Sequence, residues 1–478
     1  MSQVVTVAKE EWRYWLRSRL VQIGLIVFAV LLVFTSILTA SRVTELRHER
    51  VHQQEQAEQT FRDQPDRHPH RMVHYGHYAF RAPTPLAQFD PGVDAVTGQS
   101  IFLEGHRQNS AMFAEARGTA RAGGFGSLTP ALIYQLFLPL LLIAIGHAAI
   151  VREREAKTLA PLMAQGLNGP ALYLGKGLAL LGLIAGLSVP ALFGGGLAVT
   201  QGESLSVALG LYGAYFIYLG IWGALILTVS CLVRSRGVAL GLLLMMWIFS
   251  ALVVPRIAVT WASYSLPSEG KIITDMRMNE DLRKLGDGHN SADPAFAKLK
   301  SNLLAQYDVE SVDELPVNFR GLVAQQSEGE LTETLNKYAE KRMSRELEQS
   351  KRVDSFGLIS PYVAISAASR TLAGTDLSTH HRFLREAEAL RFDFVQGLNT
   401  AHIEKLSYAD DMARNKDEAS GKRARVSSEN WQILQDFNFQ PDTAATRFGQ
   451  AIASLISLLI WLLGIIFIGL LASRRLRP

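Results

Sequence analysis

The stretch FGSLTPALIYQLFLPLLLIAIG (residues 125–146), followed closely by VREREAKTLAPLMAQG (151–166), decides the fold of this chain. The first stretch has no Asp, Glu, Lys or Arg and exceeds the about 20 apolar residues that a helix needs to cross a bilayer core. The second stretch opens with alternating charges and then becomes apolar again. Because a charged side chain is costly at the centre of a bilayer, 151–166 is predicted to lie at the membrane surface.

Six charge-free runs divide the chain. They cover residues 20–41, 122–151, 177–202, 204–233, 237–255 and 448–473. Only 19% of the 478 residues are charged, and the mean hydropathy is +0.11. A soluble core would not produce six such runs, so we expect an integral membrane protein with six spans.

Basic residues next to the spans predict the topology. They form four clusters: Lys9, Arg13, Arg17 and Arg19; Arg152, Arg154 and Lys157; Arg234 and Arg236; Arg474, Arg475 and Arg477. With six crossings all four clusters fall on one side, which the positive-inside rule assigns to the cytoplasm. The net charge of +4 reflects this bias, so no nucleic-acid partner is expected. The single cysteine, Cys231, lies in the fourth run, so the external segments have no disulfides.

The expected fold class is an all-α integral membrane protein with a large, mainly α-helical extracytoplasmic domain. Its predicted order is an amphipathic elbow helix (1–19), TM1 (20–41), extracytoplasmic segment 1 (42–121), TM2 (126–150), a cytoplasmic coupling helix (151–169), TM3 (171–200), TM4 (205–233), TM5 (237–258), extracytoplasmic segment 2 (259–446), TM6 (448–473) and a cytoplasmic tail (474–478).

Two parts of this layout leave alternatives open. Residues 2–19 have apolar residues at helical spacing with charges between them, typical of a helix in the membrane interface; the alternative is a plain extension of TM1. In segment 2 we expect helices at about 268–286, 294–307, 320–354 and 379–415, with a break at SPYVAISAASRTLAGTD (360–376).

The segment 151–166 also has two interpretations. It is either a charged stop followed by a connector, or a short amphipathic helix that docks a cytoplasmic partner. In the second interpretation Thr158, Leu159, Leu162 and Met163 face the membrane or the partner, and the charges of RERE (152–155) form the rim, giving orientation as well as attachment.

RERE followed by TL (158–159), between the second and third of six spans, resembles the coupling element of ABC-2-type exporter permeases. The N-terminal helix is similar to the elbow helix of that family. The usual pattern has Gly before Thr, whereas Lys157 stands here. Segments 74–110, 125–146 and 360–388 resemble a subgroup of these permeases with large extracytoplasmic insertions of unassigned role. The genes for this subgroup often accompany genes for outer-membrane uptake receptors in Gram-negative bacteria. The resemblance covers nearly the whole chain.

The resemblance implies a permease subunit of an ATP-driven exporter in the bacterial inner membrane, with both termini cytoplasmic and both large segments periplasmic. The implied partners are cytoplasmic ABC ATPase subunits and a second permease, as a homodimer or a sister heterodimer. The residues implied to couple to the ATPase are Arg152, Glu153, Arg154, Glu155, Thr158, Leu159 and Leu162.

No enzymatic site is expected in the chain itself. GPALYLGKG (169–177) is no phosphate-binding loop, because five residues separate Gly169 from Gly175 and Gly177 replaces the Ser/Thr that meets magnesium. No cofactor is therefore expected here; ATP and Mg²⁺ belong to the partner ATPase. The spans have no acidic residue, which argues against a secondary carrier. A different class remains open: a membrane-anchored sensor or scaffold whose external domain binds a partner.

Histidines are concentrated in segment 1, which holds seven of the twelve. Imidazole is a common ligand of zinc, copper and nickel. The metal-ligand candidates are His48 and His52, one helical turn apart, with His74 and His77. Surface or hydrogen-bonded core histidines are the alternative explanation.

Overall fold

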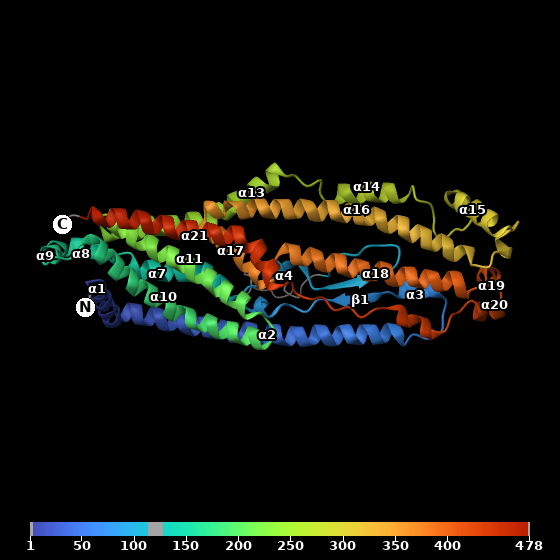
Figure 1. Cartoon of the computed structure of the whole chain (residues 1–478), viewed down its shortest axis with the longest axis horizontal. Helices are drawn as coiled ribbons and strands as arrows, with labels where there is room; N and C mark the ends of the chain where they lie inside the picture. Colours follow the sequence, from blue (N-terminus) through green and yellow to red (C-terminus); the bar gives the residue numbers. More distant parts are fainter. Residues whose placement is uncertain (1–2, 113–127, 477–478) are drawn as a thin grey trace.

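The computed structural model describes residues 3–112 and 128–476. Parts of four predicted segments lie outside these residues: 1–2, 113–121, 126–127 and 477–478. The molecule is elongated, with a helical bundle at one end and long helices extending from it (Figure 1). The helices are α1 (Gln3–Arg17), α2 (Arg19–Arg62), α3 (Pro69–Tyr75), α4 (Asp94–Thr97), α6 (Pro130–Leu132), α7 (Leu138–Gly146), α8 (Val151–Glu155), α9 (Leu159–Ala164), α10 (Gly169–Thr200), α11 (Leu205–Leu232), α12 (Arg236–Ile248), α13 (Val254–Ser265), α14 (Lys271–Leu282), α15 (Ala297–Tyr307), α16 (Phe319–Ser355), α17 (Pro361–Ala373), α18 (Leu377–Lys405), α19 (Tyr408–Ala413), α20 (Glu418–Arg423) and α21 (Ala444–Arg474).

Short elements complete the fold. The strands β1 (His77–Phe80) and β2 (Ser100–Leu103) form an antiparallel pair. Two π-helical segments, η2 (Ile133–Phe137) and η3 (Phe249–Val253), interrupt helices of the bundle. The 3₁₀ turns are η1 (Pro85–Gln88), η4 (Pro294–Phe296), η5 (Val312–Glu314), η6 (Phe356–Leu358) and η7 (Ser428–Ile433).

The prediction of six membrane-spanning helices is confirmed. Six helical segments of the described chain are long and apolar enough to cross a bilayer: Val21–Arg62, Pro130–Glu155, Gly169–Thr200, Leu205–Leu232, Arg236–Ser265 and Ala444–Arg474. The protein is therefore a multi-pass, predominantly α-helical membrane protein. With 44 residues, α2 is about 66 Å long at 1.5 Å per residue, twice the bilayer core, so it continues beyond the bundle.

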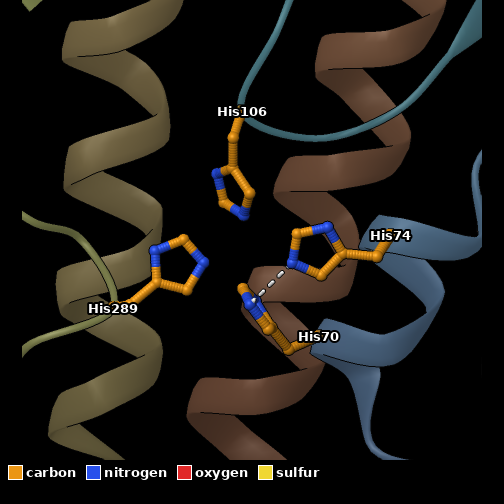
Figure 2. Close-up of side chains that lie close together, drawn as sticks. All are labelled: His70, His74, His106 and His289. Carbon is orange, nitrogen blue, oxygen red and sulfur yellow. Dashed lines mark hydrogen bonds between the residues drawn. The ribbon is translucent and has the colours of Figure 1, made fainter.

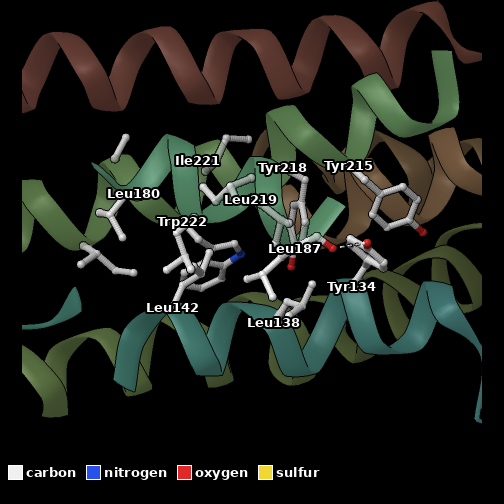
Figure 3. Packing of buried hydrophobic residues seen from close by; sticks show 14 of the residues in the cluster. Tyr134, Leu138, Leu142, Leu180, Leu187, Tyr215, Tyr218, Leu219, Ile221 and Trp222 are labelled. Carbon is white, nitrogen blue, oxygen red and sulfur yellow. Dashed lines mark hydrogen bonds between the residues drawn. The ribbon is translucent and has the colours of Figure 1, made fainter. Parts of the chain in front are cut away.

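The centre of the bundle is the fourth span, α11, of whose most apolar window 78% is buried; the corresponding value for the first span is 17%. Trp222 of α11 packs against the second and third spans, near Leu142 and Leu180 (Figure 3). Tyr134 donates a hydrogen bond to the Leu187 carbonyl oxygen at 2.7 Å. In lipid such packing and hydrogen bonding, not water exclusion, hold helices together.

The N-terminal helix is separate from the first span. Ser18, with extended backbone angles, lies between α1 and α2, and its side chain caps α2 by accepting from the Val21 N–H. α1 packs alongside α10, with Trp15 buried. The structure thus has a distinct helix at this point and not the plain extension of the first span.

The predicted break at 360–376 is wrong, because residues 361–373 form the buried helix α17. Ser360 caps its N-terminus, Pro361 occupies the first turn, and Gly374 ends it with φ of 68°. These residues are the usual start and stop signals of a helix. The helix is rich in small residues, which allow close packing against its neighbours. α17 lies against α11 and α21.

The π-helical segments are tied to this helix and to α11. Ser360 donates to the Ser250 carbonyl oxygen of η3 at 2.7 Å, and Tyr218 donates to the Gln135 carbonyl oxygen of η2 at 2.7 Å. A π turn displaces backbone carbonyls from their helical partners, and these hydroxyls satisfy them.

The described chain outside the bundle is called the distal part: residues 42–112, 266–355 and 374–443. The other predicted helices of segment 2 are present here as α14, α15, α16 and, split in two near residue 406, α18 and α19. A second core joins α3 and the β-pair to α18 through Phe61, Met72, Ile101, Phe383 and Phe394. The strand pair is not anticipated from the sequence.

Candidate functional site

The predicted coupling segment contains two short helices, α8 and α9. The prediction of one helix over 151–169 is wrong because Lys157 has φ of 58°, a left-handed conformation that ends α8. Thr158 stabilises this turn: its N–H donates to the Glu153 carbonyl oxygen at 2.9 Å, and its Oγ1 donates to Glu153 Oε2 at 2.7 Å.

Replacing Lys157 by glycine is expected to stabilise the protein by about 1 kcal/mol, because a left-handed conformation is strained for a residue with a Cβ and free for glycine. Lys157→Ala is the matched control, since it removes the same side chain and keeps the strain. Thermal unfolding in detergent would show a higher Tm for the glycine variant alone; equal Tm values would contradict the assignment.

A buried ionic network holds this segment to two other helices. Glu11 of α1 is 1% exposed and accepts hydrogen bonds from Arg152 of α8 and Lys176 of α10. Lys176 also donates to Glu153 Oε1 at 3.1 Å. The Arg152 guanidinium lies 3.7 Å from the centroid of the Tyr14 ring. α1, α8 and α10 are therefore joined by charges that alternate in sign.

The other two charges of RERE reach the ends of α11 and α12. Arg154 donates to the backbone carbonyls of Val233 and Cys231 at the C-terminus of α11, where a cation is favoured. Glu155 pairs with the Arg236 side chain and accepts from the Arg236 N–H at 2.8 Å at the start of α12. The four charged side chains of RERE therefore contact other helices of this chain. They do not form the outward-facing rim that the sequence predicted.

The apolar residues of the segment differ in exposure. Leu159 is 1% exposed and belongs to the bundle core, Leu162 and Met163 are half-buried, and Thr158 is exposed. Leu159 thus faces inward, unlike its expected orientation towards the membrane or a partner. The outward surface of α9, called the α9 face, consists of Ala160, Pro161, Ala164 and Gln165, all exposed.

Sequence reasoning missed Glu11 and Lys176, yet both had a signal. Glu11 lies three residues from Ala8 and four from Trp15, so it occupies the apolar side of α1. Lys176 is the last charge before a 26-residue uncharged run. A carboxylate and an amine on otherwise apolar helix faces are expected to be paired.

The four histidines predicted as metal-ligand candidates do not lie together. His48 and His52 are exposed on α2. His77 is buried beside the Phe61 ring and lies 3.3 Å from Gln54 Nε2. Only His74 joins a group of potential ligands, with His70, His106 and His289. The spacing of His70 and His74, one helical turn apart, was the available signal.

A second group contains His68, His402 and Asp411, all buried. Asp411 lies 3.0 Å from His68 Nε2 and 2.7 Å from His402 Nε2. It also lies near the charged side chains of Arg320 and Arg414. With two guanidiniums at the carboxylate, this group stabilises the fold of the distal part and is unsuited to a cation.

Two other buried histidines predict a pH-dependent stability of the distal part. Burial, with Arg62 near His77 and Arg81 near His380, lowers the pKa of each histidine to about 4. The value in an unfolded chain is about 6.5. Because the pKa is lower in the folded protein, each neutral histidine makes its full contribution to the free energy of unfolding above a pH of about 6.5. That contribution is lost as the pH falls towards 4, by up to about 1.4 kcal/mol per pH unit for each group.

Unfolding measured between pH 7.5 and 4.5 tests this expectation. The double variant His77→Gln/His380→Gln should lose less stability on acidification than the unmodified protein. His52→Gln, at an exposed position of α2, is the control and should keep the full dependence. Equal slopes for all three proteins would contradict the expectation.

No curated protein matches the chain. Residues 271–440, from the start of α14 to the segment before α21, match the family described as "Domain of unknown function (DUF3526)", so this portion of the distal part is similar to a recurring protein domain whose function is not assigned.

Proposed function

We propose that this protein is the transmembrane permease subunit of an ATP-driven ABC exporter in a bacterial inner membrane. It pairs with a second permease, either another copy or a sister chain, and with separate cytoplasmic ATPase subunits that bind ATP and Mg²⁺. In this proposal both termini are cytoplasmic and the distal part is periplasmic. The transported substrate is not assigned.

The observation that carries the proposal is the gathering of α1, α8, α9 and the end of α21 at one end of the bundle, opposite the distal part (Figure 1). This arrangement suits an end of the bundle that binds a cytoplasmic partner. The left-handed backbone at Lys157 adds support, because the resembled permeases carry glycine at this position and glycine favours that conformation.

The ionic contacts suggest how motion is transmitted. The α9 face projects beyond the bundle, while the preceding helix α8 is bound to α1 and α10 through Glu11, Arg152 and Lys176. Arg154 and Glu155 extend these contacts to α11 and α12. ATP-driven displacement of the α9 face therefore moves the ends of four helices together, because ion pairs with little exposure resist separation.

The distal part offers space for a substrate or a partner. A cavity of about 1170 Å³ lies among α14, α16, α18 and the segment after β2. Its lining combines charged residues such as Glu333, Arg342 and Arg385 with apolar residues such as Leu335 and Met343. In the proposal this cavity receives or hands on the substrate.

Co-purification with cross-linking tests the proposal. Cysteine is introduced at Ala164 on the α9 face, with Ala297→Cys in the exposed first turn of α15 as the matched control. The native Cys231 is 5% exposed and contributes little background. We expect a stoichiometric ATPase to co-purify and to cross-link through position 164 only. A chain that purifies without an ATPase would contradict the exporter and favour the membrane-anchored scaffold.

A further inference from the structure

Four histidines from three separate parts of the chain meet in the distal part. His70 and His74 lie on α3, His106 follows β2, and His289 lies in the loop between α14 and η4. Their imidazole rings face one shared space (Figure 2). We call this group the four-histidine cluster. The helix α3, which carries two of these histidines, lies towards the opposite end of the molecule from α9 (Figure 1).

The ring separations match a tetrahedral metal site. Four imidazoles bound at a metal–nitrogen distance of about 2.0–2.1 Å have centroids about 5.2 Å apart and nitrogens about 3.3 Å apart. The six centroid separations in the cluster range from 4.7 to 6.1 Å. His70 Nε2 and His74 Nε2 are 3.2 Å apart, and all potential ligand atoms lie within 4.8 Å of one another.

The second ring nitrogens of two histidines face carboxylates. His106 Nδ1 lies 3.0 Å from the buried Glu328, and His289 Nδ1 lies 3.4 Å from Asp287. Carboxylates behind metal-bound histidines fix the ring orientation and leave Nε2 free as the ligand. His106 Nε2 is buried and has no hydrogen-bond partner in the described structure. A buried, unpartnered nitrogen beside three other imidazoles is suited to bind a cation.

The loop that carries His106 is strained in a way that serves the cluster. His106 has φ of 66°, and its N–H donates to Glu328 Oε2 at 3.1 Å. A Cβ on the preceding Gly105 would lie 2.1 Å from Val73 Cγ1 of α3, so glycine permits the close approach of this loop to α3. Residues in unfavourable backbone conformations cluster at functional sites.

The ligand type narrows the choice of metal. Imidazole suits zinc, copper and nickel, whereas magnesium and calcium require oxygen ligands. His74 and His289 are exposed, which gives an ion access from solvent.

We propose that His70, His74, His106 and His289 bind one divalent transition-metal ion, with Zn²⁺ as the preferred occupant. The ion joins α3 and the β2 loop to the loop at 283–293, which belongs to the matched domain 271–440. It therefore fastens the two extracytoplasmic segments together across the fold.

Metal titration of the full-length protein in detergent, after chelator treatment, tests the site. Zn²⁺ binding is measured by calorimetry, and Co²⁺ is used as a spectroscopic probe because tetrahedral Co²⁺ absorbs strongly in the visible range. We expect one ion per chain, a tetrahedral Co²⁺ spectrum, and at least 100-fold weaker Zn²⁺ binding for His106→Ala and His289→Ala. Asp287→Ala should weaken binding 10- to 100-fold, as for other carboxylates behind a ligand.

The control is His48→Ala/His52→Ala, which removes an exposed histidine pair one turn apart on α2 and should bind Zn²⁺ like the unmodified protein. His289 lies in an exposed loop, so its variant is expected to fold, which size-exclusion chromatography checks. Absence of stoichiometric Zn²⁺ binding by the unmodified protein would overturn the proposal. Unchanged affinity in the His106 and His289 variants would do the same.

Discussion

Replacement of Arg391 by alanine is expected to destabilise the distal part by about 3–5 kcal/mol. Arg391 is 1% exposed on α18 and forms hydrogen bonds to Glu388, Glu328 and Thr332. Glu328 is 0% exposed and Glu388 is 7% exposed, so removal of the guanidinium leaves two buried carboxylates without their common partner. Urea-dependent hydrogen exchange at the backbone amides of α18 measures the loss in the distal part.

The matched control is Arg385→Ala, on the same helix. Arg385 pairs with Glu340 at the surface, where both side chains are more than 40% exposed. Surface ion pairs contribute about 0–1 kcal/mol, so a small effect is expected. Comparable losses in the two variants would show that the burial of the Arg391 network has no energetic consequence.

Replacement of Glu11 by glutamine is expected to destabilise the bundle by about 3 kcal/mol, because it leaves the buried Lys176 and the half-buried Arg152 with only the partly exposed Glu153 as a carboxylate partner. The variant keeps the shape of the side chain and removes only its charge. In the proposed exporter it should also lower transport relative to ATP hydrolysis, since α8 is released from α1.

Glu10→Gln is the control for this second prediction. Glu10 is adjacent on α1, and its side chain is 59% exposed and pairs with the exposed Arg13. Thermal unfolding in detergent should separate the two variants by several degrees. If Glu11→Gln unfolds at the same temperature as Glu10→Gln, the network does not fasten α1 to the bundle.

The membrane-spanning helices were the part of the fold that could be predicted most completely from the sequence. A charge-free run long enough to cross a bilayer has few alternatives to a transmembrane helix, because backbone groups in lipid must form their hydrogen bonds within the helix. The same reasoning failed at 360–376, where Ser, Ala and Gly suggested a break. Those small residues form α17 because they allow close packing against α11 and α21, which depends on tertiary contacts.

The candidate site shows a similar limit. The sequence predicted that RERE lies outside the hydrocarbon but not that Arg152 and Glu153 turn inward to Glu11 and Lys176, residues 141 and 23 positions away along the chain. Likewise, the pair His70 and His74 has a helical spacing that can be read directly. His289 joins this pair from more than 200 residues later, and only the fold brings it there.

The most direct test of the central claim is the sidedness of the α9 face. In intact spheroplasts a membrane-impermeant maleimide should label Ala297→Cys in the distal part and leave Ala164→Cys unlabelled. In inverted membrane vesicles the pattern should reverse. Labelling of position 164 from the outside of intact spheroplasts would contradict the account, because no cytoplasmic ATPase could then reach the α9 face.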